Sequence, residues 1–590
     1  MYFETNAAIV GNNYGITKYD RETKTNVFVS LGTAAFIEEI QESIETEDIS
    51  LKLSFTYHKS HKRLTLSRAI LVNKNEISKL AEKGIDVTLK NFNTFVDTIR
   101  IQERDIRKAN QDIIYTYENL GWIQIPNYDN VGNVESMDLC YRSHELIGDY
   151  EAKYTGTYQV TPNGNFKTWR TMVIDEVIGH TIAELVLISA LTAIIVGVLA
   201  QKVPVENPIM HFYYLSGKGK STMAHLATSI AGQPFNGELK IFDTETGNYV
   251  SKRSLLQSWA STSNAIVTTQ AGNRGVPTIL DEFGKFKGKN PSDVIFNFSE
   301  GSDKQRLNGE MKSYISEGYN TVFISFGESS LLEKCSDKLE GLNVRVMEIN
   351  EPLTKDSAQA RKIKNTVANH NGWASSMLAE YVINNGGINY VKNLYDKWIT
   401  ELSSVFPETP SGERVIEKFY ALFLTTAEIA TDALDIPFSI EALKDYFYNY
   451  ELTQGKKRNI SASSYEILIE YFDINKNNFY IDKEKIAKYQ AWGKISNKHR
   501  VSKTGKTIIR EYAVRRSIVH KALLDNGFKN KETCISEWKN AGLIEHDIDR
   551  PTRSRKIEPK SKKQEDVYVF VVYEDDNVEV GEDDDNSTNA

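Results

Sequence analysis

The residues most suited to chemistry form one short run, Ser216-Gly217-Lys218-Gly219-Lys220-Ser221-Thr222, between an apolar segment and a helix-like segment. A phosphate-binding loop needs a turn whose N–H groups face the β-phosphate, a lysine that reaches the β- and γ-phosphates, and a hydroxyl that ligates Mg²⁺. Gly219, Lys220 and Ser221 meet these needs, so we interpret the run as an ATP-binding loop. The alternative is a lysine-rich surface turn, because Gly-Lys-Ser also occurs by chance.

The flanking residues agree with a strand, loop and helix in that order. Residues 211–215 predict a buried strand, and residues 222–230 predict a helix that ends near Gly232. Tyr214 stands where the pattern G-x-x-x-x-G-K-[ST] has its first glycine, and a side chain there is strained if its φ is positive. Gly217 is the residue that could supply the flexibility instead.

A second set of residues lies about 60 positions downstream. Residues 275–282 predict an apolar strand that ends in Asp281 and Glu282. Such a pair suits the Walker B arrangement, in which one acid joins Ser221 in holding Mg²⁺ and the next polarises the attacking water. The alternative is a strand that ends in a solvated acidic pair.

Two further segments predict strands with one polar residue each. Residues 320–326 contain Ser325, with Glu328 just beyond, and in AAA+ ATPases a polar residue at this strand end helps to orient the water. Residues 341–349 place Arg345 in an apolar strand, where a charge needs a partner. We interpret Arg345 as an arginine finger for a neighbouring subunit, the alternative being an edge-strand arginine paired with Glu348 or Glu351.

Between these segments, Asn308-Gly309 predicts a β-hairpin. Its basic residues, Lys304, Arg306 and Lys312, are candidate DNA contacts. The alternative is an ordinary surface hairpin.

These residues together carry a resemblance that covers the chain from about residue 11 to residue 434. It resembles a family catalogued as a domain of unknown function in MCM-like AAA+ replicative helicases of mobile elements, among them those of staphylococcal cassette chromosome elements. The matching segments are Leu120-Gly-Trp122, the apolar stretch before the loop, Gly219-Lys-Ser221, Leu280-Asp-Glu282, Ile324-Ser-Phe-Gly-Glu328, Val344-Arg-Val346 and Gly412-Glu-Arg414.

The resemblance implies roles that the spacing alone does not. Arg345 falls at the family's arginine finger, and Arg414 falls where a second sensor lies on the lid. The family works on DNA as hexamers, so the resemblance also implies a homo-hexamer, 3′→5′ translocation, replication of a mobile element, and partners among the element's other replication proteins. Tyr214 departs from the family's glycine, which puts nucleotide affinity in question.

Length and composition bound the architecture. A chain of 590 residues is too long for one core, and 40% hydrophobic with 25% charged residues is ordinary for globular proteins. Three cysteines without paired spacing argue against a zinc module or disulfides, and favour a reducing cytoplasm. Residues 182–200 are almost long enough to span a bilayer, but Glu184, Pro204 and the loop downstream favour a buried helix, with no membrane contact.

The N-terminal part, to residue 165, predicts strands at residues 50–57, 64–72 and 156–160 and helices at 76–83 and 90–96, without a catalytic set. A basic, aromatic loop at residues 57–63 is more simply a solvated loop than a nucleic-acid contact.

The C-terminal part predicts a helix-turn-helix over residues 515–542 followed by a wing. Residues 485–563 contain 21 Lys and Arg against 8 Asp and Glu, in a chain of net charge −8. Such an excess favours binding to DNA phosphates, with protein contacts as the alternative. The candidate contacts are Arg515, Arg516, Arg553, Arg555 and Lys556.

The predicted fold is α/β: an AAA+ P-loop ATPase core at 166–352, an α+β N-terminal domain at 1–165, a helical lid at 353–455, a winged-helix DNA-binding domain at 456–573 and an acidic disordered tail at 574–590. The predicted activity is ATP- and Mg²⁺-dependent unwinding of DNA, with single-stranded and duplex DNA as partners. Two alternatives stay open: a DNA-binding initiator that binds nucleotide without unwinding, and an AAA+ remodelling ATPase in phage defence.

Overall fold

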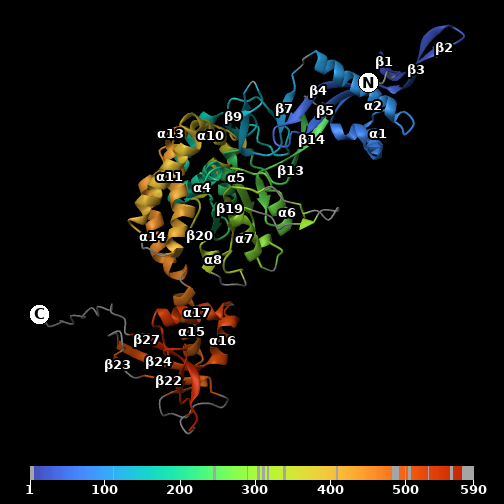
Figure 1. Ribbon diagram of the computed structural model, residues 1–590. Helices are drawn as coiled ribbons and strands as arrows, with labels where there is room; N and C mark the ends of the chain where they lie inside the picture. The colour runs from blue at the N-terminus through green and yellow to red at the C-terminus, as the bar shows by residue number, and fades with distance from the viewer. Residues whose placement is uncertain are drawn as a thin grey trace.

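The computed structural model describes residues 6–573 (Figure 1), with gaps inside that range at 110–111, 130, 244–247, 289, 302–305, 308–312, 315–317, 336–339, 407–409, 459, 482–490, 498–499, 502–506, 529 and 559–561. The predicted acidic tail lies outside the described residues. So do Lys304, Asn308, Gly309 and Lys312 of the predicted hairpin.

The N-terminal unit combines two sheets with an amphipathic helix, α2 (Phe92–Lys108). Phe92, Phe95, Val96 and Ile99 follow the helical spacing and are buried against the strands. The sheets have the orders β1-β2-β3 and β11-β7-β4-β5-β6. The elements are β1 (Ala7–Val10), β2 (Asn13–Asp20), β3 (Thr25–Thr33), β4 (Ala35–Ser43), β5 (Ile49–Tyr57), β6 (Ser60–Ser67), α1 (Ile77–Lys83), β7 (Ile114–Tyr117) and β11 (Lys153–Tyr154).

Two predictions for this unit were wrong in detail. The strand predicted over residues 64–72 ends at Ser67, whose hydroxyl caps a 3-10 helix over Arg68–Val72 by accepting from the Ala69 N–H. The strand predicted over residues 156–160 is a single bridge between Tyr158 and Arg253.

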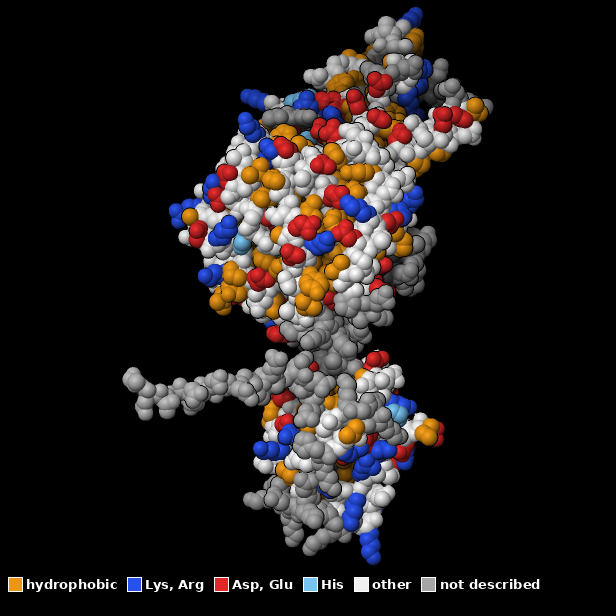
Figure 2. Space-filling view, turned by 90° about the vertical axis from the view of Figure 1, so that its left-hand side faces the viewer, with side chains coloured by type: hydrophobic (Ala, Val, Ile, Leu, Met, Phe, Trp, Pro, Cys, Tyr) orange, Lys and Arg blue, Asp and Glu red, His pale blue; other side chains and the backbone are white. Residues whose placement is uncertain are grey.

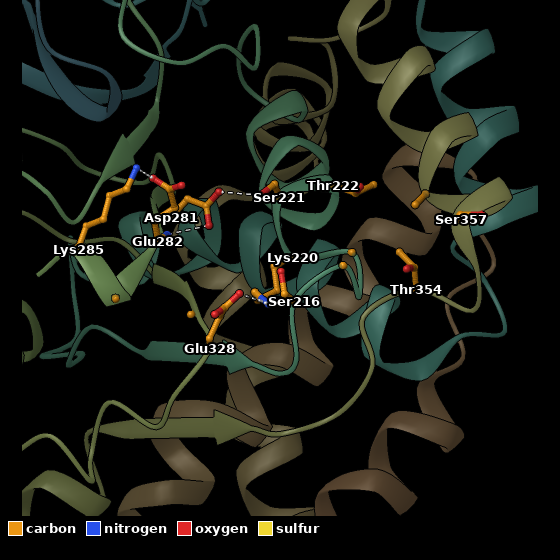
Figure 3. Close-up of a pocket in the computed structure, with 15 residues that line it drawn as sticks. Ser216, Lys220, Ser221, Thr222, Asp281, Glu282, Lys285, Glu328, Thr354 and Ser357 are labelled. Atoms are coloured by element: carbon orange, nitrogen blue, oxygen red, sulfur yellow. Dashed lines mark hydrogen bonds and ion pairs between the residues drawn. The ribbon is translucent and has the colours of Figure 1, made fainter.

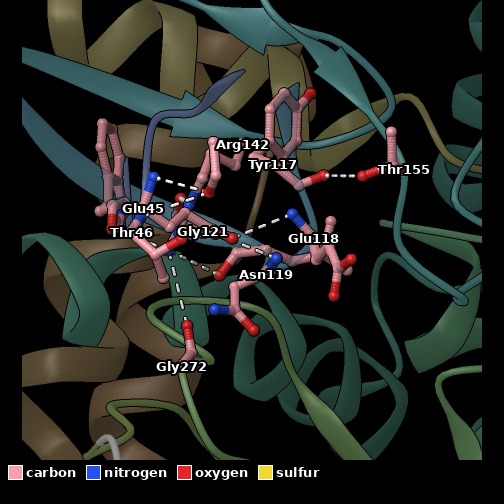
Figure 4. Close-up of polar contacts among 12 residues, drawn as sticks. Glu45, Thr46, Tyr117, Glu118, Asn119, Gly121, Arg142, Thr155 and Gly272 are labelled. Atoms are coloured by element: carbon pink, nitrogen blue, oxygen red, sulfur yellow. Dashed lines mark hydrogen bonds and ion pairs between the residues drawn. The ribbon is translucent and has the colours of Figure 1, made fainter. Parts of the chain in front are cut away.

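A buried ion pair joins the N-terminal unit to the central unit (Figure 4). Glu45, between β4 and β5, contacts Arg142 and also accepts from the Glu118 and Asn119 N–H groups, both at 3.0 Å. Arg142 in turn donates to the Gly121 carbonyl at 3.0 Å. Gly121 and Arg142 belong to two strands of a further sheet, which has the order β10-β9-β8. Its strands are β8 (Gly121–Tyr128), β9 (Val134–Arg142) and β10 (Leu146–Ile147).

The central unit is built on five parallel strands in the order β15-β16-β19-β12-β20. Because all five are parallel, their carboxyl ends meet at one edge, where open α/β sheets bind ligands. The strand that precedes the glycine-rich loop, β12, lies between β19 and β20. The strands are β12 (Ile209–Tyr213), β15 (Leu256–Ser258), β16 (Thr278–Asp281), β19 (Phe323–Gly327) and β20 (Val346–Ile349).

Alternation along the strands sends side chains into two separate cores. Met210 and Phe212 join the large cluster formed with α4 and α5, whereas Ile209 joins a second cluster with Trp259 and α7. The helices of this unit are α3 (Phe166–Glu176), α4 (Thr181–Leu199), α5 (Lys220–Ser229), α6 (Ser263–Thr268), α7 (Ser292–Glu300) and α8 (Glu340–Asn343). A two-stranded ribbon, β13 (Glu238–Asp243) and β14 (Asn248–Arg253), follows α5.

The apolar helix α4 is long and apolar enough to cross a membrane, and it lies completely buried in the protein. Its one acidic residue, Glu184, is 1% exposed and accepts from the Gly179 N–H, the Ser439 N–H and the Ser439 hydroxyl. These bonds satisfy the buried carboxylate, as burial of a charge requires.

Helices after the sheet pack around α4 and share its core. They are α9 (Ser357–Asn369), α10 (Ala374–Asn384), α11 (Gly387–Ser403), α12 (Pro410–Val415), α13 (Ala421–Leu434) and α14 (Ile440–Arg458), with a π-helical turn over Ile416–Tyr420 between α12 and α13. The large cluster also contains Trp122 and Tyr141. The domain boundaries at 165 and 352 stay predictions, and apolar packing is continuous across both.

The C-terminal unit begins with α15 (Ile460–Ile474) and is the separate red body in Figure 1. Its helices α16 (Arg516–Asp525) and α17 (Lys531–Asn540) lie within the helix-turn-helix predicted over residues 515–542. Trp538 and Phe570 anchor the core between helices and sheet. The strands are β21 (Phe479–Ile481), β22 (Gly493–Ser496), β23 (Arg500–Val501), β24 (Thr507–Arg515), β25 (Ile544–Glu545), β26 (Arg553–Arg555) and β27 (Glu565–Tyr573).

Candidate nucleotide site

The glycine-rich loop connects β12 to the first residue of α5. Gly217 and Gly219 have φ angles of +74° and +90°, a region that suits glycine. A Cβ on Gly219 would lie 2.4 Å from Thr354 Cγ2, so the loop also packs too closely for a side chain there. Tyr214 is not among the residues with positive φ. The strain expected at this departure from the glycine pattern is therefore absent.

A pocket of about 600 Å³ opens where the loop meets the carboxyl edge of the sheet (Figure 3). Six of the seven loop residues predicted to bind ATP line it, and Lys218 does not. Lys218 is exposed, and its carbonyl accepts from the Leu353 N–H at 3.2 Å. The lining residues are Ser216, Gly217, Gly219, Lys220, Ser221, Thr222, Asp281, Glu282, Gly284, Lys285, Gly327, Glu328, Thr354, Ser357 and Ala360.

The Lys220 ammonium is held inside this pocket. It donates to the Tyr214 carbonyl at 2.7 Å and to the Leu215 carbonyl at 2.9 Å, and Glu328 Oε1 lies 3.6 Å from Nζ. Its side chain is 13% exposed. A cation fixed beside loop N–H groups at the start of a helix is suited to a phosphate.

Asp281 and Glu282 lie opposite the loop and have different partners. The Ser221 hydroxyl donates to Asp281 Oδ2 at 3.1 Å, so the two predicted Mg²⁺ ligands are adjacent. Burial raises the pKa of Asp281. Glu282 has φ +62°, a left-handed conformation that costs a non-glycine residue about 1 kcal/mol, and such strain clusters at active sites. Lys285 Nζ lies 2.5 Å from its carboxylate.

Ser325, predicted to orient the water, does not line the pocket. Its hydroxyl is 2.8 Å from His211 Nδ1 and accepts from Trp259 Nε1 at 3.0 Å, and the residue is completely buried. Ser325 lies two residues before the end of β19, which continues to Gly327, and its hydroxyl is enclosed by His211 and Trp259. Among the described residues of this strand end, Gly327 and Glu328 line the pocket.

His211 was missed as a functional residue, because in the sequence it reads only as part of a strand. Burial lowers its pKa to about 4, so the ring is neutral. Its Nε2 lies 2.9 Å from the Ser329 carbonyl. His211 therefore contacts Ser325 and Ser329, the residues on either side of the segment that carries Glu328.

Arg345 lies outside β20, which corrects the expectation that it sits in the strand. It stands in the turn between α8 and β20, 4.8 Å from the Phe296 ring, and donates to the Gly341 carbonyl at 2.9 Å. Glu300 Oε1 lies 3.9 Å from its guanidinium. The pairing with Glu348 or Glu351 was wrong: Glu348 accepts from Ser330 and from backbone N–H groups, and Glu351 accepts from Tyr446.

Arg414 donates to Glu206 Oε1 at 2.9 Å and is 48% exposed. The lining of the pocket, as far as the chain is described, includes neither Arg345 nor Arg414. Both arginines instead carry charges that lower the pKa of Lys418, whose ammonium is bonded to Glu206.

The pocket also contains residues that the sequence did not single out: Lys285, Thr354 and Ser357. Ser357 begins α9, whose N-cap Asp356 accepts from the Ala358 and Gln359 N–H groups, both at 2.8 Å. An N-cap residue before a helical pattern was the available signal for this helix start.

The predicted hairpin is present as an antiparallel pair, β17 (Arg306–Leu307) with β18 (Ser313–Tyr314). Leu307 pairs with Ser313, so residues 308–312, including the Asn-Gly pair, lie between the strands and outside the described residues.

The candidate DNA contacts of the C-terminal unit fall into two groups. Arg515 is 18% exposed and donates to both oxygens of Glu565, at 2.9 Å each, and Arg553 and Arg555 both contact Glu545. Arg516 and Lys556 are exposed. Figure 2 shows Lys and Arg side chains on the described surface of this unit.

Comparisons with known proteins bear on the whole chain. Residues 10–313 match a family described as Domain of unknown function (DUF927), and residues 459–576 match the Cch helix turn helix domain. No protein of curated function matches the sequence.

One solved structure, "SCCmec type IV Cch - active helicase", aligns with a TM-score of 0.73 at 20% identity, over 97% of this chain and 98% of that chain. A candidate ATPase from Cytophaga hutchinsonii has a TM-score of 0.21 at 11% identity, over 48% of this chain and 86% of that chain, a likeness too weak to indicate a shared fold. The resemblance to helicases of staphylococcal cassette chromosome elements is confirmed as a likeness of fold, and so is a C-terminal helix-turn-helix.

Proposed function

This chain belongs to the DUF927 family, and we propose that it is an ATP-driven DNA helicase of the MCM-like AAA+ type. The observation that carries the proposal is the convergence of Lys220, the Ser221–Asp281 pair and Glu282 on one pocket at the carboxyl edge of a parallel sheet. The strand order, with the loop strand between β19 and β20, supports an AAA+ core.

In this pocket the substrate is ATP with its Mg²⁺. The loop N–H groups and Lys220 bind the phosphates, because they are the fixed donors and the fixed cation of the site. Ser221 and Asp281 hold the metal that arrives with the nucleotide. Glu282 polarises the attacking water, and Glu328 takes the position at the end of β19 that Ser325 was expected to have.

Arg345 and Arg414 act, in this proposal, on the pocket of a neighbouring copy. Their separation from their own pocket supports a role at a subunit interface. An arginine supplied in trans stabilises the charge that develops on the γ-phosphate. A closed ring needs the same interface at every junction, so we propose a homo-oligomer, with six subunits as the expected number.

DNA meets the ring at two places. The β17–β18 hairpin follows α7 and is the proposed moving contact, with Lys304, Arg306 and Lys312. The C-terminal unit is the proposed loading platform for duplex DNA, supported by its match to the Cch helix turn helix domain and by its basic residues. The biological role proposed from the likeness of fold is replication of a mobile element in the cytoplasm, with 3′→5′ movement.

The test is forked-duplex unwinding with ATP, run beside Lys220→Ala and the matched control Lys218→Ala. Lys220→Ala should abolish ATPase and unwinding, because it removes the phosphate-directed cation. Lys218 is exposed outside the pocket, so its variant should retain both activities. DNA binding with ATPase but without unwinding by the wild-type protein would instead favour an initiator.

A further inference from the structure

Lys418 is a buried lysine that neither the pocket nor the predicted DNA contacts use. It lies on the π-helical turn over Ile416–Tyr420, between α12 and α13, and is 5% exposed. Single π-helical turns within helices are rare and often occur at functional sites. A lysine is almost never this deeply buried unless its charge is paired.

The Lys418 ammonium has two oxygen partners. It donates to Glu206 Oε2 at 2.9 Å and to the Ser299 hydroxyl oxygen at 2.5 Å. Ser299 lies in the last turn of α7, directly before the β17–β18 hairpin, and Glu206 lies before β12. Lys418 therefore connects the helices after the sheet to the sheet itself and to the helix that leads into the hairpin.

Glu206 is shared between two cations. Its Oε1 accepts from Arg414 at 2.9 Å, while its Oε2 accepts from Lys418. Burial opposes ionisation of Glu206, but Lys418 and Arg414 outweigh it and lower its pKa to about 2. Burial lowers the pKa of Lys418, with Glu206 opposing and with Arg345 and Arg414 adding to the shift. The Glu206 carboxylate thus pairs with a buried cation, Lys418, and with an exposed cation, Arg414.

We propose that Lys418 is a positioning residue that keeps Glu206 neutralised, so that Arg414 is free to leave Glu206 for a phosphate in the neighbouring subunit's pocket. This inference rests on the proposed function, because it needs Arg414 to act in trans.

The physical reason is the cost of leaving a carboxylate unpaired. Without Lys418, Arg414 would be the main close counter-charge of Glu206 among the described residues. Moving Arg414 away would then leave the half-buried Glu206 carboxylate without a counter-charge, which is unfavourable. The attraction would hold Arg414 on its own subunit. With Lys418 in place, Glu206 keeps a charge-assisted hydrogen bond when Arg414 leaves.

The test compares three variants of the full chain in DNA-stimulated ATPase: Lys418→Met, Glu206→Gln and the double variant. Lys418→Met should lower kcat about tenfold with KM for ATP unchanged, which is the rate equivalent of about one charge-assisted hydrogen bond. Glu206→Gln should keep kcat within about twofold of wild type, because Arg414 is then untethered. The double variant should recover most of the activity. Lys362→Met, an exposed lysine paired with Glu176 at 2.6 Å, is the control and should change neither parameter.

Two results would overturn the inference. One is a wild-type kcat for Lys418→Met. The other is a double variant that folds, as judged by thermal unfolding, yet stays as slow as Lys418→Met. If Lys418→Met does not fold, Glu206→Gln decides: a reduction of kcat as large as that of Arg414→Ala would contradict the untethering of Arg414.

A failure of the proposed function gives results that differ from a failure of the Lys418 inference. Arg414→Ala is assayed alone and after mixing with Lys220→Ala. If Arg414→Ala alone has full ATPase, Arg414 has no role in trans, and the proposed interface fails whatever Lys418 does. If Arg414→Ala is slow and recovers on mixing, the interface stands, and the Lys418 and Glu206 variants test the positioning role by itself.

Discussion

Lys220 and Glu328 form an ion pair within the pocket, with 3.6 Å between the lysine Nζ and Glu328 Oε1. The lysine that should receive the γ-phosphate therefore has an anion of the protein beside it. Figure 3 shows the two side chains pointing toward one another, from the start of α5 and from the end of β19. A phosphate that binds Lys220 has to compete with this carboxylate.

Glu328→Gln should bind ATP about two- to fivefold more tightly than wild type, because it removes the competing charge, and exposed ion pairs are worth less than about 1 kcal/mol. Glu328 is 64% exposed, which is why the expected gain is small. The measurement is titration of a fluorescent ATP analogue, with Glu333→Gln as the control, since Glu333 is exposed in the same segment and does not line the pocket. Weaker binding by Glu328→Gln would contradict the competition.

Glu282→Gln should bind ATP with near wild-type affinity and hydrolyse it at least about 100-fold more slowly, because it removes the group that polarises water and keeps the shape of the side chain. Nucleotide titration and single-turnover hydrolysis separate the two steps. The left-handed backbone of Glu282 is retained in the variant, so its folding should be unchanged. Normal hydrolysis would remove Glu282 from the proposed chemistry.

Arg345→Ala and Lys220→Ala should each be nearly inactive alone but recover ATPase when mixed. In a random equal mixture, about a quarter of the interfaces would pair an intact Lys220 with an intact Arg345, so the expected recovery is about a quarter of the wild-type rate. Arg345 stacks on Phe296, which predicts some reduction of thermal stability as well. If Arg345 is only structural, mixing will restore nothing and the reduced stability will be the whole effect.

The loop side of the candidate nucleotide pocket was predictable from the sequence because its parts are local. A strand, a glycine turn and a helix start lie within residues 209–229, and Asp281 ends another strand of the same sheet at the same edge. The position of Tyr214 was the one doubtful feature, and its backbone avoids the conformation that would have strained it.

The differences came from where a strand ends and from packing between distant segments. Ser325 lies two residues before the end of β19, because the strand continues to Gly327, one residue beyond the predicted end at Phe326. Arg345 contacts Phe296 and Glu300 of α7 as well as the nearby Gly341 carbonyl, and no local spacing indicates which helix covers a turn. Lys418 carried no signal in the sequence, since its partner Glu206 is distant in the chain.

The rate should depend on pH through Lys418. Burial lowers its pKa to about 8, and the charged groups around it are Glu206 before β12, Arg345 before β20 and Arg414 on α12. As pH rises through about 8, Lys418 loses its proton while Glu206 stays ionised, so Arg414 is held and kcat should fall.

Stability should move in the opposite direction. The folded-state pKa lies below the ordinary lysine value, so the cost of the buried charge is fully present below pH 8 and is removed as pH rises toward 10.5. Parallel profiles of kcat and thermal unfolding between about pH 6.5 and 9.5 check both signs, and Lys418→Met should flatten both. A kcat profile that falls equally in Lys418→Met would assign the titration to another group.

Exposure divides the basic residues of the C-terminal unit into proposed DNA contacts and structural cations. Replacing Arg516 and Lys556 by alanine should weaken duplex binding and lower the slope of log affinity against log salt by about 0.9 for each phosphate that the protein no longer neutralises.

Arg515→Ala should instead lower thermal stability, because Arg515 holds Glu565 through two hydrogen bonds and donates to the Ala491 carbonyl at 2.6 Å. Its salt slope should stay near wild type, since a cation paired with a carboxylate releases few counterions. The measurements are fluorescence anisotropy with duplex DNA across a series of salt concentrations and thermal unfolding of each variant. An unchanged slope for the Arg516 and Lys556 variant, with a reduced slope for Arg515→Ala, would contradict this division of the basic residues.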